Sequence, residues 1–247
     1  MTDARTTELA ANLRAVRERI ARACDDAGRP QATLIVVTKY FPADDVRRLA
    51  DLGVTDVGEN RDQEARAKAA ECAELPLTWH FIGQLQTNKA KFVVRYADLV
   101  HTVDRDALVA ALDKAAGARS LTQDVLIQVS LDPPDRPGRG GIAPAAVPAL
   151  ADLVGDAEHL RLRGVMGVAP LDQDPDPAFA QLAGIAAHLS AEHPGAEIIS
   201  AGMSSDLEAA VSHGATHLRI GTAVMGSRPT VRYRPIEGGK HNEGEAQ

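Results

Sequence analysis

The stretch Thr33-Leu34-Ile35-Val36-Val37-Thr38-Lys39 is an apolar run that ends on a lysine. Its unbroken series of β-prone residues predicts a strand that is buried on both faces, as in a parallel sheet covered by helices. A lysine at the end of such a strand can carry its amine out to water, or it can be buried, which is costly for a charged ammonium. Buried lysines are the usual carbonyl traps, so Lys39 is a candidate for forming an imine.

Seven further strand patterns follow this one, with helical patterns between them. The expected strands are 34–38, 54–58, 78–82, 99–102, 125–129, 160–166, 197–200 and 217–220. The expected helices are 43–52, 61–73, 88–96, 105–116, 145–153, 178–192 and 207–213. Eight strand–helix units with right-handed crossovers predict an α/β fold, a single (β/α)8 TIM-like barrel. A doubly wound sheet is the alternative, but no Gly-x-Gly-x-x-Gly follows the first strand.

An extra helix is expected before the first strand. Its apolar stripe repeats every three or four residues through Leu9, Leu13, Val16, Ile20 and Cys24. We expect one barrel domain over residues 1–236. The polar, glycine-rich segment 237–247 is expected to be a disordered tail.

The composition narrows the class of protein. The chain has 247 residues, of which 45% are hydrophobic and only 3% aromatic, so an aliphatic core of full size is expected. The net charge of -7 argues against a nucleic-acid partner. No membrane-spanning run or signal sequence is found, which predicts a cytoplasmic protein with no membrane partner. The two cysteines have no metal-site spacing, and the few aromatic residues favour a monomer.

The binding site of such a barrel lies at the carboxyl ends of its strands. Gly202 with Ser204 or Ser205 follows the seventh strand, and Gly221 with Thr222 follows the eighth. Backbone free of side chains, hydroxyl groups and helix N-termini together suit a phosphate. Either loop alone is equally typical of an ordinary helix cap. The two loops together, where barrels commonly bind phosphate, predict a phosphate cup.

Three polar residues near strand ends complete the candidate site. Arg219 alternates with two apolar neighbours, so its side chain is expected to point into the barrel. There it needs a partner, which could be an anion, a ring nitrogen or a carboxylate such as Glu59. Asn60 and His80 are weaker candidates, because a strand histidine is more often a hydrogen-bonded core residue than a ligand. The sequence thus predicts a barrel with a buried lysine, Lys39, at one strand end and a phosphate cup at two others. A phosphorylated aldehyde would satisfy both, and pyridoxal 5'-phosphate is the obvious one.

The sequence resembles the pyridoxal phosphate homeostasis protein family, the single-domain relatives of the alanine racemase N-terminal barrel. The matching stretches are Val37-Thr38-Lys39, Val57-Gly58-Glu59-Asn60, residues 79–89, Arg163-Gly164-Val165-Met166, Gly202-Met203-Ser204-Ser205-Asp206 and Arg219-Ile220-Gly221-Thr222. The block His80-Phe81-Ile82-Gly83 is highly specific, whereas the other stretches are specific mainly in combination. The resemblance covers nearly the whole chain except the tail.

The resemblance implies a role for each candidate residue. Lys39 would form the Schiff base with pyridoxal phosphate, and Arg219 would lie near the pyridine nitrogen, which disfavours protonation of that nitrogen. Asn60 and His80 would line the ring. Ser204, Ser205, Gly221 and Thr222 would hold the phosphate, and Met203 is a further cofactor-binding candidate. Arg139 departs from the family, because many relatives carry a lysine there; an arginine could attract phosphate but could not form an imine.

Two functions compete within this resemblance. A racemase needs an acid or base on each face of the substrate carbon, and in racemases one of them comes from a second domain that the family lacks. The leading hypothesis is therefore a protein that binds, stores or delivers pyridoxal phosphate in vitamin B6 homeostasis, with PLP-dependent apo-enzymes as possible recipients. The alternative is a PLP-dependent amino-acid racemase or lyase. A phosphosugar-binding barrel without the cofactor is a third interpretation.

Overall fold

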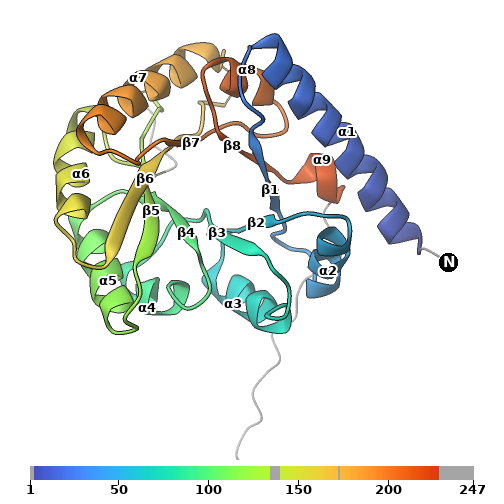
Figure 1. Cartoon of the computed structure of the whole chain (residues 1–247), viewed down its shortest axis with the longest axis horizontal. Helices are drawn as coiled ribbons and strands as arrows, with labels where there is room; N and C mark the ends of the chain where they lie inside the picture. The colour runs from blue at the N-terminus through green and yellow to red at the C-terminus, as the bar shows by residue number, and fades with distance from the viewer. Residues whose placement is uncertain (1–2, 134–139, 172, 228–247) are drawn as a thin grey trace, which may run out of the picture.

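The strands of the computed structural model form a closed parallel barrel in which neighbours in the sequence are neighbours in space, and β8 pairs with β1 (Figure 1). The structure describes residues 3–133, 140–171 and 173–227. The strands are β1 (Thr33–Val37), β2 (Asp56–Glu59), β3 (Thr78–Phe81), β4 (Leu99–Val103), β5 (Gln123–Gln128), β6 (Leu160–Met166), β7 (Ile198–Ser200) and β8 (His217–Ile220). The predicted (β/α)8 barrel is confirmed, and all eight predicted strands are present.

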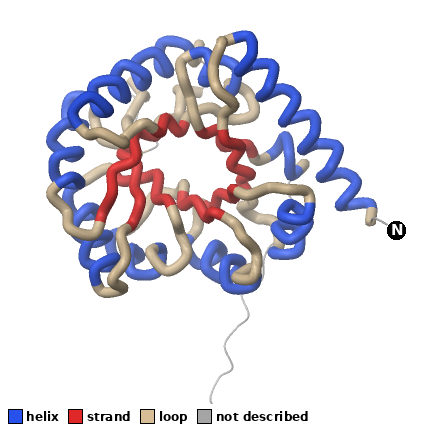
Figure 2. Tube along the Cα trace, in the orientation of Figure 1, coloured by secondary structure: helices blue, strands red, loops and turns tan. Residues whose placement is uncertain are grey.

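The helices form a ring outside the strands (Figure 2). They are α1 (Ala4–Asp26), α2 (Ala43–Asp51), α3 (Asp62–Glu71), α4 (Ala90–Val93), α5 (Asp106–Gly117), α6 (Val147–Gly155), α7 (Asp176–Glu192), α8 (Leu207–Ser212) and α9 (Thr222–Met225). Two short 3-10 helices, η1 (Thr87–Lys89) and η2 (Pro144–Ala146), precede α4 and α6. No helix in the described ranges combines the length and the hydropathy that a membrane span requires.

The helix expected over 88–96 is shorter than predicted. The chain forms η1 and then a single α-helical turn in α4. The physical reason is Asp98, whose backbone N–H donates to Trp79 O at 2.8 Å while its carboxylate accepts from Trp79 N at 2.7 Å. These two bonds hold the chain against β3, so the helix ends before β4 begins.

The extra N-terminal helix is confirmed as α1, which lies against α8 and α9 outside the barrel (Figure 1). Asp3 caps its first turn, because the Asp3 side chain accepts from Thr6 N at 2.8 Å. All five residues of the predicted apolar stripe are buried. The tail predicted over 237–247 and the end of the predicted barrel domain, residues 228–236, lie outside the described residues.

The apolar core is divided by the barrel wall. The larger cluster fills the space between strands and helices, whereas a small one joins Leu99, Leu126 and Met166, which alternate with outward-facing strand residues. The side chains inside a barrel of this type are usually layers of branched apolar residues. Here the buried strand residues also include the polar side chains His80, His101, Ser200 and Arg219.

Candidate functional site

Lys39 lies in a turn just past β1, at the carboxyl edge of the barrel. The next residue, Tyr40, has a φ of 72°, and its backbone N–H donates to Glu64 Oε1 at 2.6 Å. Lys39 is partly exposed rather than buried, which corrects the sequence expectation. The reason is that β1 ends at Val37 and the turn carries the next residues toward the barrel mouth. Among the described residues Lys39 Nζ has no hydrogen bond or ion pair, so its amine is available.

The buried lysine of this region is Lys68 on α3, which is 5% exposed. Its Nζ donates to Thr38 O at 2.7 Å and to Glu59 Oε1 at 2.6 Å, and it lies 2.9 Å from Glu64 Oε1. Burial raises the pKa of Glu59, although Lys68 and Thr38 act in the opposite direction. The network supports the turn that carries Lys39. Sequence reasoning missed it, although the Glu64–Lys68 spacing of four residues on a helix is a usable signal.

Arg219 points into the barrel from β8, as predicted, and is 5% exposed. Its Nη1 donates to Ser200 Oγ at 2.6 Å and its Nη2 to Gly167 O at 2.8 Å. Burial lowers the pKa of Arg219 to about 10. Within the described part of the chain no carboxylate forms an ion pair with it, and the suggested partner Glu59 binds Lys68 instead. Arg219 is thus a buried cation beside the carboxyl end of the barrel without a direct counter-charge.

The loop after β7 differs from the expected helix cap. Asp206 occupies the position before α8, and its Oδ1 accepts from Met203 N at 2.6 Å. Ser204 and Ser205 therefore precede the cap and do not bond the helix, which corrects the predicted capping role. Ser204 is partly buried and Ser205 is exposed. In the described part of the chain neither hydroxyl forms a hydrogen bond, so both remain available to a ligand.

The two glycines of the predicted phosphate cup serve different purposes. Gly202 has a φ of +87°, and a Cβ there would lie 2.7 Å from the Ala210 Cβ, so the fold itself requires glycine. A Cβ on Gly221 would meet only ordinary contacts, the nearest being Val37 Cβ at 3.5 Å. Gly221 directly precedes α9, whose first residue, Thr222, is exposed. Because β8 pairs with β1, Gly221 and Thr222 follow the strand end next to that of Lys39.

Asn60 follows β2 and contributes a buried acceptor without a partner. Its Oδ1 is buried and has no hydrogen bond among the described residues. The Asn60 backbone lies so close to Gly83 that a Cβ on that glycine would be 2.1 Å from Asn60 O. This contact explains the glycine at the end of the specific block 80–83. An unpaired buried amide oxygen near a strand end fits a ligand that brings a polar group.

His80 lies deeper in the barrel and is 2% exposed. Its Nδ1 is 2.9 Å from His101 Nε2, and its Nε2 is 3.0 Å from Asp56 Oδ1. Both ring nitrogens are therefore engaged by the protein, and contact of His80 with a cofactor ring stays a prediction. Sequence reasoning considered a core histidine but missed its partner His101, which lies on the next strand two residues beyond Leu99, the register partner of His80.

The donor set fits a phosphorylated aldehyde. A free primary amine can condense with the aldehyde, the hydroxyls after β7 and β8 can donate to a phosphate, and the Arg219 guanidinium can donate to a ring nitrogen. Within the described residues no group of three or more metal-ligating side chains is found. Arg139 lies outside the described residues.

The fold and the site first define a broad class, the barrel proteins that share the alanine racemase N-terminal domain. The family model for that domain matches residues 11–229. A pyridoxal phosphate homeostasis protein of Mycobacterium bovis is 44% identical over 245 residues, covering 91% of this chain and 94% of that protein. The corresponding Escherichia coli K12 protein is 36% identical over 229 residues, covering 90% and 97%. The chain belongs to the pyridoxal phosphate homeostasis protein family.

Solved structures agree with this assignment. PipY of Synechococcus elongatus, solved with PLP bound, is 37% identical and aligns with a TM-score of 0.75 over 88% of this chain and 100% of PipY. The alanine racemase of Streptomyces coelicolor aligns with a TM-score of 0.74 over 89% of this chain, but at 20% identity, so the likeness shows the fold alone. This chain covers only 58% of that racemase.

Proposed function

We propose that this protein binds pyridoxal 5'-phosphate as a Schiff base on Lys39 and stores or delivers it in vitamin B6 homeostasis. The observation that carries the proposal is the Lys39 amine, which has no hydrogen bond or ion pair within the described ranges and lies on the strand end next to Gly221 and Thr222. The names of the relatives and the PLP bound to PipY support the same cofactor.

Each residue of the site has a distinct part in this proposal. The cofactor supplies a reactive aldehyde, which the Lys39 amine masks. Ser204, Ser205, Gly221 and Thr222 hold the phosphate, with Met203 in the same loop. Arg219 donates to the pyridine nitrogen and, as a cation, keeps that nitrogen unprotonated. Asn60 offers its amide oxygen at the ring, and His80 lines the ring from the barrel interior.

A carrier is favoured over an enzyme because a second acid or base is difficult to supply. Tyr96 is partly buried with its hydroxyl oxygen shielded from solvent, and burial raises the pKa of that hydroxyl, so it is a poor base. Tyr40 directly follows Lys39, so we do not expect it to serve the opposite face of a substrate; Tyr233 lies outside the described residues. A cytoplasmic location, a monomeric state and delivery to apo-enzymes belong to the same proposal.

The test is the visible absorption spectrum of the protein with pyridoxal phosphate, before and after borohydride, followed by peptide mapping. A yellow imine band that borohydride traps on Lys39 is expected, and Lys39→Ala should lose it. Lys114→Ala is the matched control, because Lys114 is an exposed lysine on α5 and should not matter. A band that survives in Lys39→Ala, or a protein that stays colourless, would overturn the proposal.

The competing enzyme hypothesis has its own measurement. A racemase must remove the α-proton of an amino acid, and a lyase that breaks another bond at the α-carbon must add a solvent proton there, so either activity introduces deuterium at that carbon in heavy water. We expect no sustained exchange across a panel of amino acids. Steady turnover of any one of them would make the protein an enzyme.

A further inference from the structure

A single chain of hydrogen bonds runs through the barrel interior and ends at Arg219. It starts at Asp56 on β2, whose Oδ1 is 3.0 Å from His80 Nε2, and continues from His80 Nδ1 to His101 Nε2 at 2.9 Å. His101 Nδ1 is 2.9 Å from Ser200 Oγ, and Ser200 Oγ accepts from Arg219 Nη1 at 2.6 Å. The chain crosses from β2 through β3, β4 and β7 to β8.

When both imidazoles are neutral, the two ends of the hydrogen-bond chain fix the direction of every bond. Arg219 can only donate, so Ser200 accepts from it and turns its own hydroxyl proton to His101 Nδ1. An ionised Asp56 can only accept, so His80 must carry a proton on Nε2. His80 Nδ1 is then the acceptor for a proton on His101 Nε2. Both imidazoles are thereby held as the neutral Nε2–H tautomer, each with one donated and one accepted bond.

The environment of His101 disfavours a charge on its ring. His101 is buried, and burial, the largest cause, lowers its pKa well below the usual value, while the neighbouring His80 and Arg219 act in the same direction. His217 on β8 faces the same region, with its ring centroid 6.4 Å from that of His80, and burial lowers its pKa to about 4. Asp206 is the acidic group that acts on Arg219. The lowered pKa of His217 leaves this neighbour of His80 uncharged at neutral pH.

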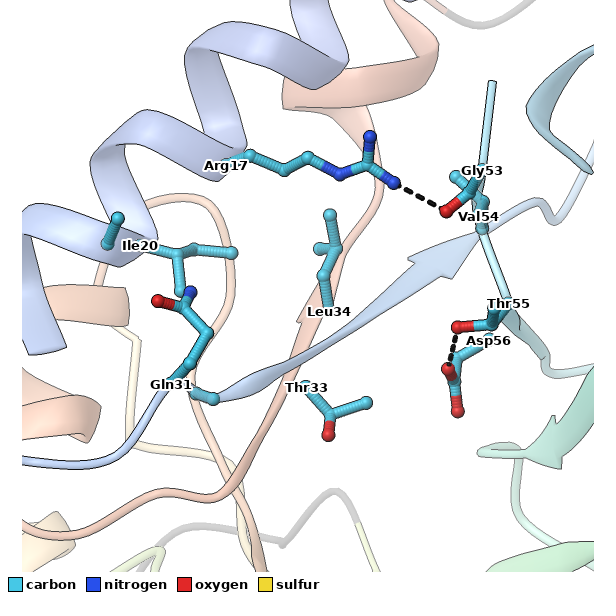
Figure 3. Close-up of a pocket in the computed structure, with 11 residues that line it drawn as sticks. Arg17, Ile20, Gln31, Thr33, Leu34, Gly53, Val54, Thr55 and Asp56 are labelled. Atoms are coloured by element: carbon cyan, nitrogen blue, oxygen red, sulfur yellow. Dashed lines mark hydrogen bonds between the residues drawn. The ribbon is translucent and has the colours of Figure 1, made fainter. Parts of the chain in front are cut away.

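The Asp56 end opens to an external hollow at the amino-terminal end of the barrel. Asp56 lines this hollow together with Thr55, Gly53 and Arg17 (Figure 3). Thr55 Oγ1 donates to Asp56 Oδ2 at 2.6 Å, which is the short dashed bond in the figure. Burial opposes ionisation of Asp56, but the bonds from His80 and Thr55 outweigh it, and the pKa of Asp56 is lowered. The acceptor end of the chain is therefore a stable carboxylate beside water.

We propose that Asp56, His80, His101 and Ser200 are positioning residues that orient Arg219 through one directional hydrogen-bond relay anchored at the opposite end of the barrel. The inference rests on the proposed function, because Arg219 is the residue assigned to the cofactor ring. The relay determines which Arg219 N–H group donates to Ser200. The Nε–H and the Nη protons that bond neither Ser200 nor Gly167 are left for a ligand. A change at Asp56 is transmitted to Arg219 without any change in the residues that contact it.

The first test uses the protein without added cofactor, labelled with nitrogen-15. A scalar coupling across the hydrogen bond between His101 Nε2 and His80 Nδ1 should be visible by NMR, with the proton attached to His101. The reverse attachment, or separate imidazoles without coupling, would overturn the relay. This result does not depend on whether pyridoxal phosphate binds, so failure of the proposed function is recognised separately.

The second test asks whether the relay reaches Arg219. Asp56→Ala should weaken or abolish the coupling and shift the Arg219 side-chain resonances, although Asp56 does not touch Arg219. Thr55→Val is the matched control. It removes the hydrogen bond that Thr55 donates to the Asp56 carboxylate but keeps that carboxylate as the acceptor for His80. In the loaded protein, Asp56→Ala should also move the pH midpoint of the imine band. Identical Arg219 resonances in wild type and Asp56→Ala would contradict the proposal, even if the variant were less stable.

The third test cuts the relay next to Arg219. Ser200→Ala removes the hydroxyl that joins His101 to the guanidinium, and Ser200→Thr restores a hydroxyl in the same place. The first variant should reproduce the Arg219 shifts of Asp56→Ala while the His80–His101 coupling persists, and the second should restore the wild-type spectrum. Loss of the His80–His101 coupling in Ser200→Ala together with unchanged Arg219 resonances would oppose the assigned order of the chain.

Discussion

Lys68 Nζ lies 2.6 Å from Glu59 Oε1 in the barrel wall, and the two side chains are only 7% and 0% exposed. The same ammonium donates to Thr38 O, one residue before Lys39. The pair thus links α3, β2 and the turn that presents the candidate imine-forming lysine. A charged pair in this position is expensive to separate, because the remaining partner would be a buried charge.

We expect Lys68→Met to reduce the free energy of unfolding by about 3–5 kcal/mol, because it leaves Glu59 buried without its cation. Adding Glu59→Gln should recover part of that loss, since the uncompensated charge disappears. Urea denaturation of the single and double variants measures both effects. A double variant less stable than Lys68→Met would show that Glu59 is not the destabilising charge.

The pair Arg161–Asp124 provides the control, because it has the same 2.6 Å separation but Arg161 is 61% exposed. Solvent screens such a pair, so Arg161→Met should change the free energy of unfolding by less than about 1 kcal/mol. Equal losses at both sites would mean that burial is not the deciding factor.

The protein should lose stability as the pH falls below about 6.5, the usual pKa of an unfolded histidine. His101 and His217 have lowered pKa values in the folded state, mainly because of burial, and that of His217 is about 4. Between the folded and unfolded values the unfolded chain binds more protons, so acid favours unfolding. Each such histidine lowers the free energy of unfolding by about 1.4 kcal/mol per pH unit in that range.

Urea midpoints measured from pH 7.5 to 4.5 test this dependence. Above pH 6.5 these two groups should contribute no slope, because both are neutral in either state. His217→Gln should flatten the acid slope. An unchanged slope in that variant would remove His217 from the account.

Gly83→Ala should destabilise the protein by about 3 kcal/mol or more, because the new Cβ would lie 2.1 Å from Asn60 O and the backbone must move. Gly184→Ala is the matched control: Gly184 lies inside α7, and a Cβ there meets no atom within 4 Å. Removing a helix-interior glycine should raise the free energy of unfolding by about 0.5–1 kcal/mol. Thermal unfolding distinguishes the opposite signs.

Thr222→Val should weaken binding of pyridoxal phosphate about tenfold or more, because it removes one hydroxyl donor to a charged phosphate. Binding of pyridoxal, which has no phosphate, should change little. Thr222→Ser keeps the hydroxyl and should behave like the wild type. Absorbance titrations with both aldehydes give the comparison, and equal weakening for the two would place Thr222 away from the phosphate.

The sequence determined the barrel and the location of the site. Hydrophobic periodicity is a local property, and it identified all eight strands and the helix α1. Strand ends follow from the strands, so the positions of Lys39, Asn60, Arg219 and Thr222 at one edge were predictable. The residue that precedes α8 was not predictable. Ser204, Ser205 and Asp206 lie in the same turn, and only the backbone geometry of that turn places Asp206 directly before the helix.

The tertiary structure decided which polar side chains meet. Glu59 was a reasonable partner for Arg219 from sequence, but it binds Lys68, nine residues away, whereas Arg219 binds Ser200. His101 and Ser200 are 99 residues apart and share a bond only because the barrel closes with its particular register. Burial of a charge depends on every element around it, so Lys39 is partly exposed and Lys68 is buried. Strand periodicity depends on residues that are close in the sequence, whereas barrel closure determines which buried charged groups pair.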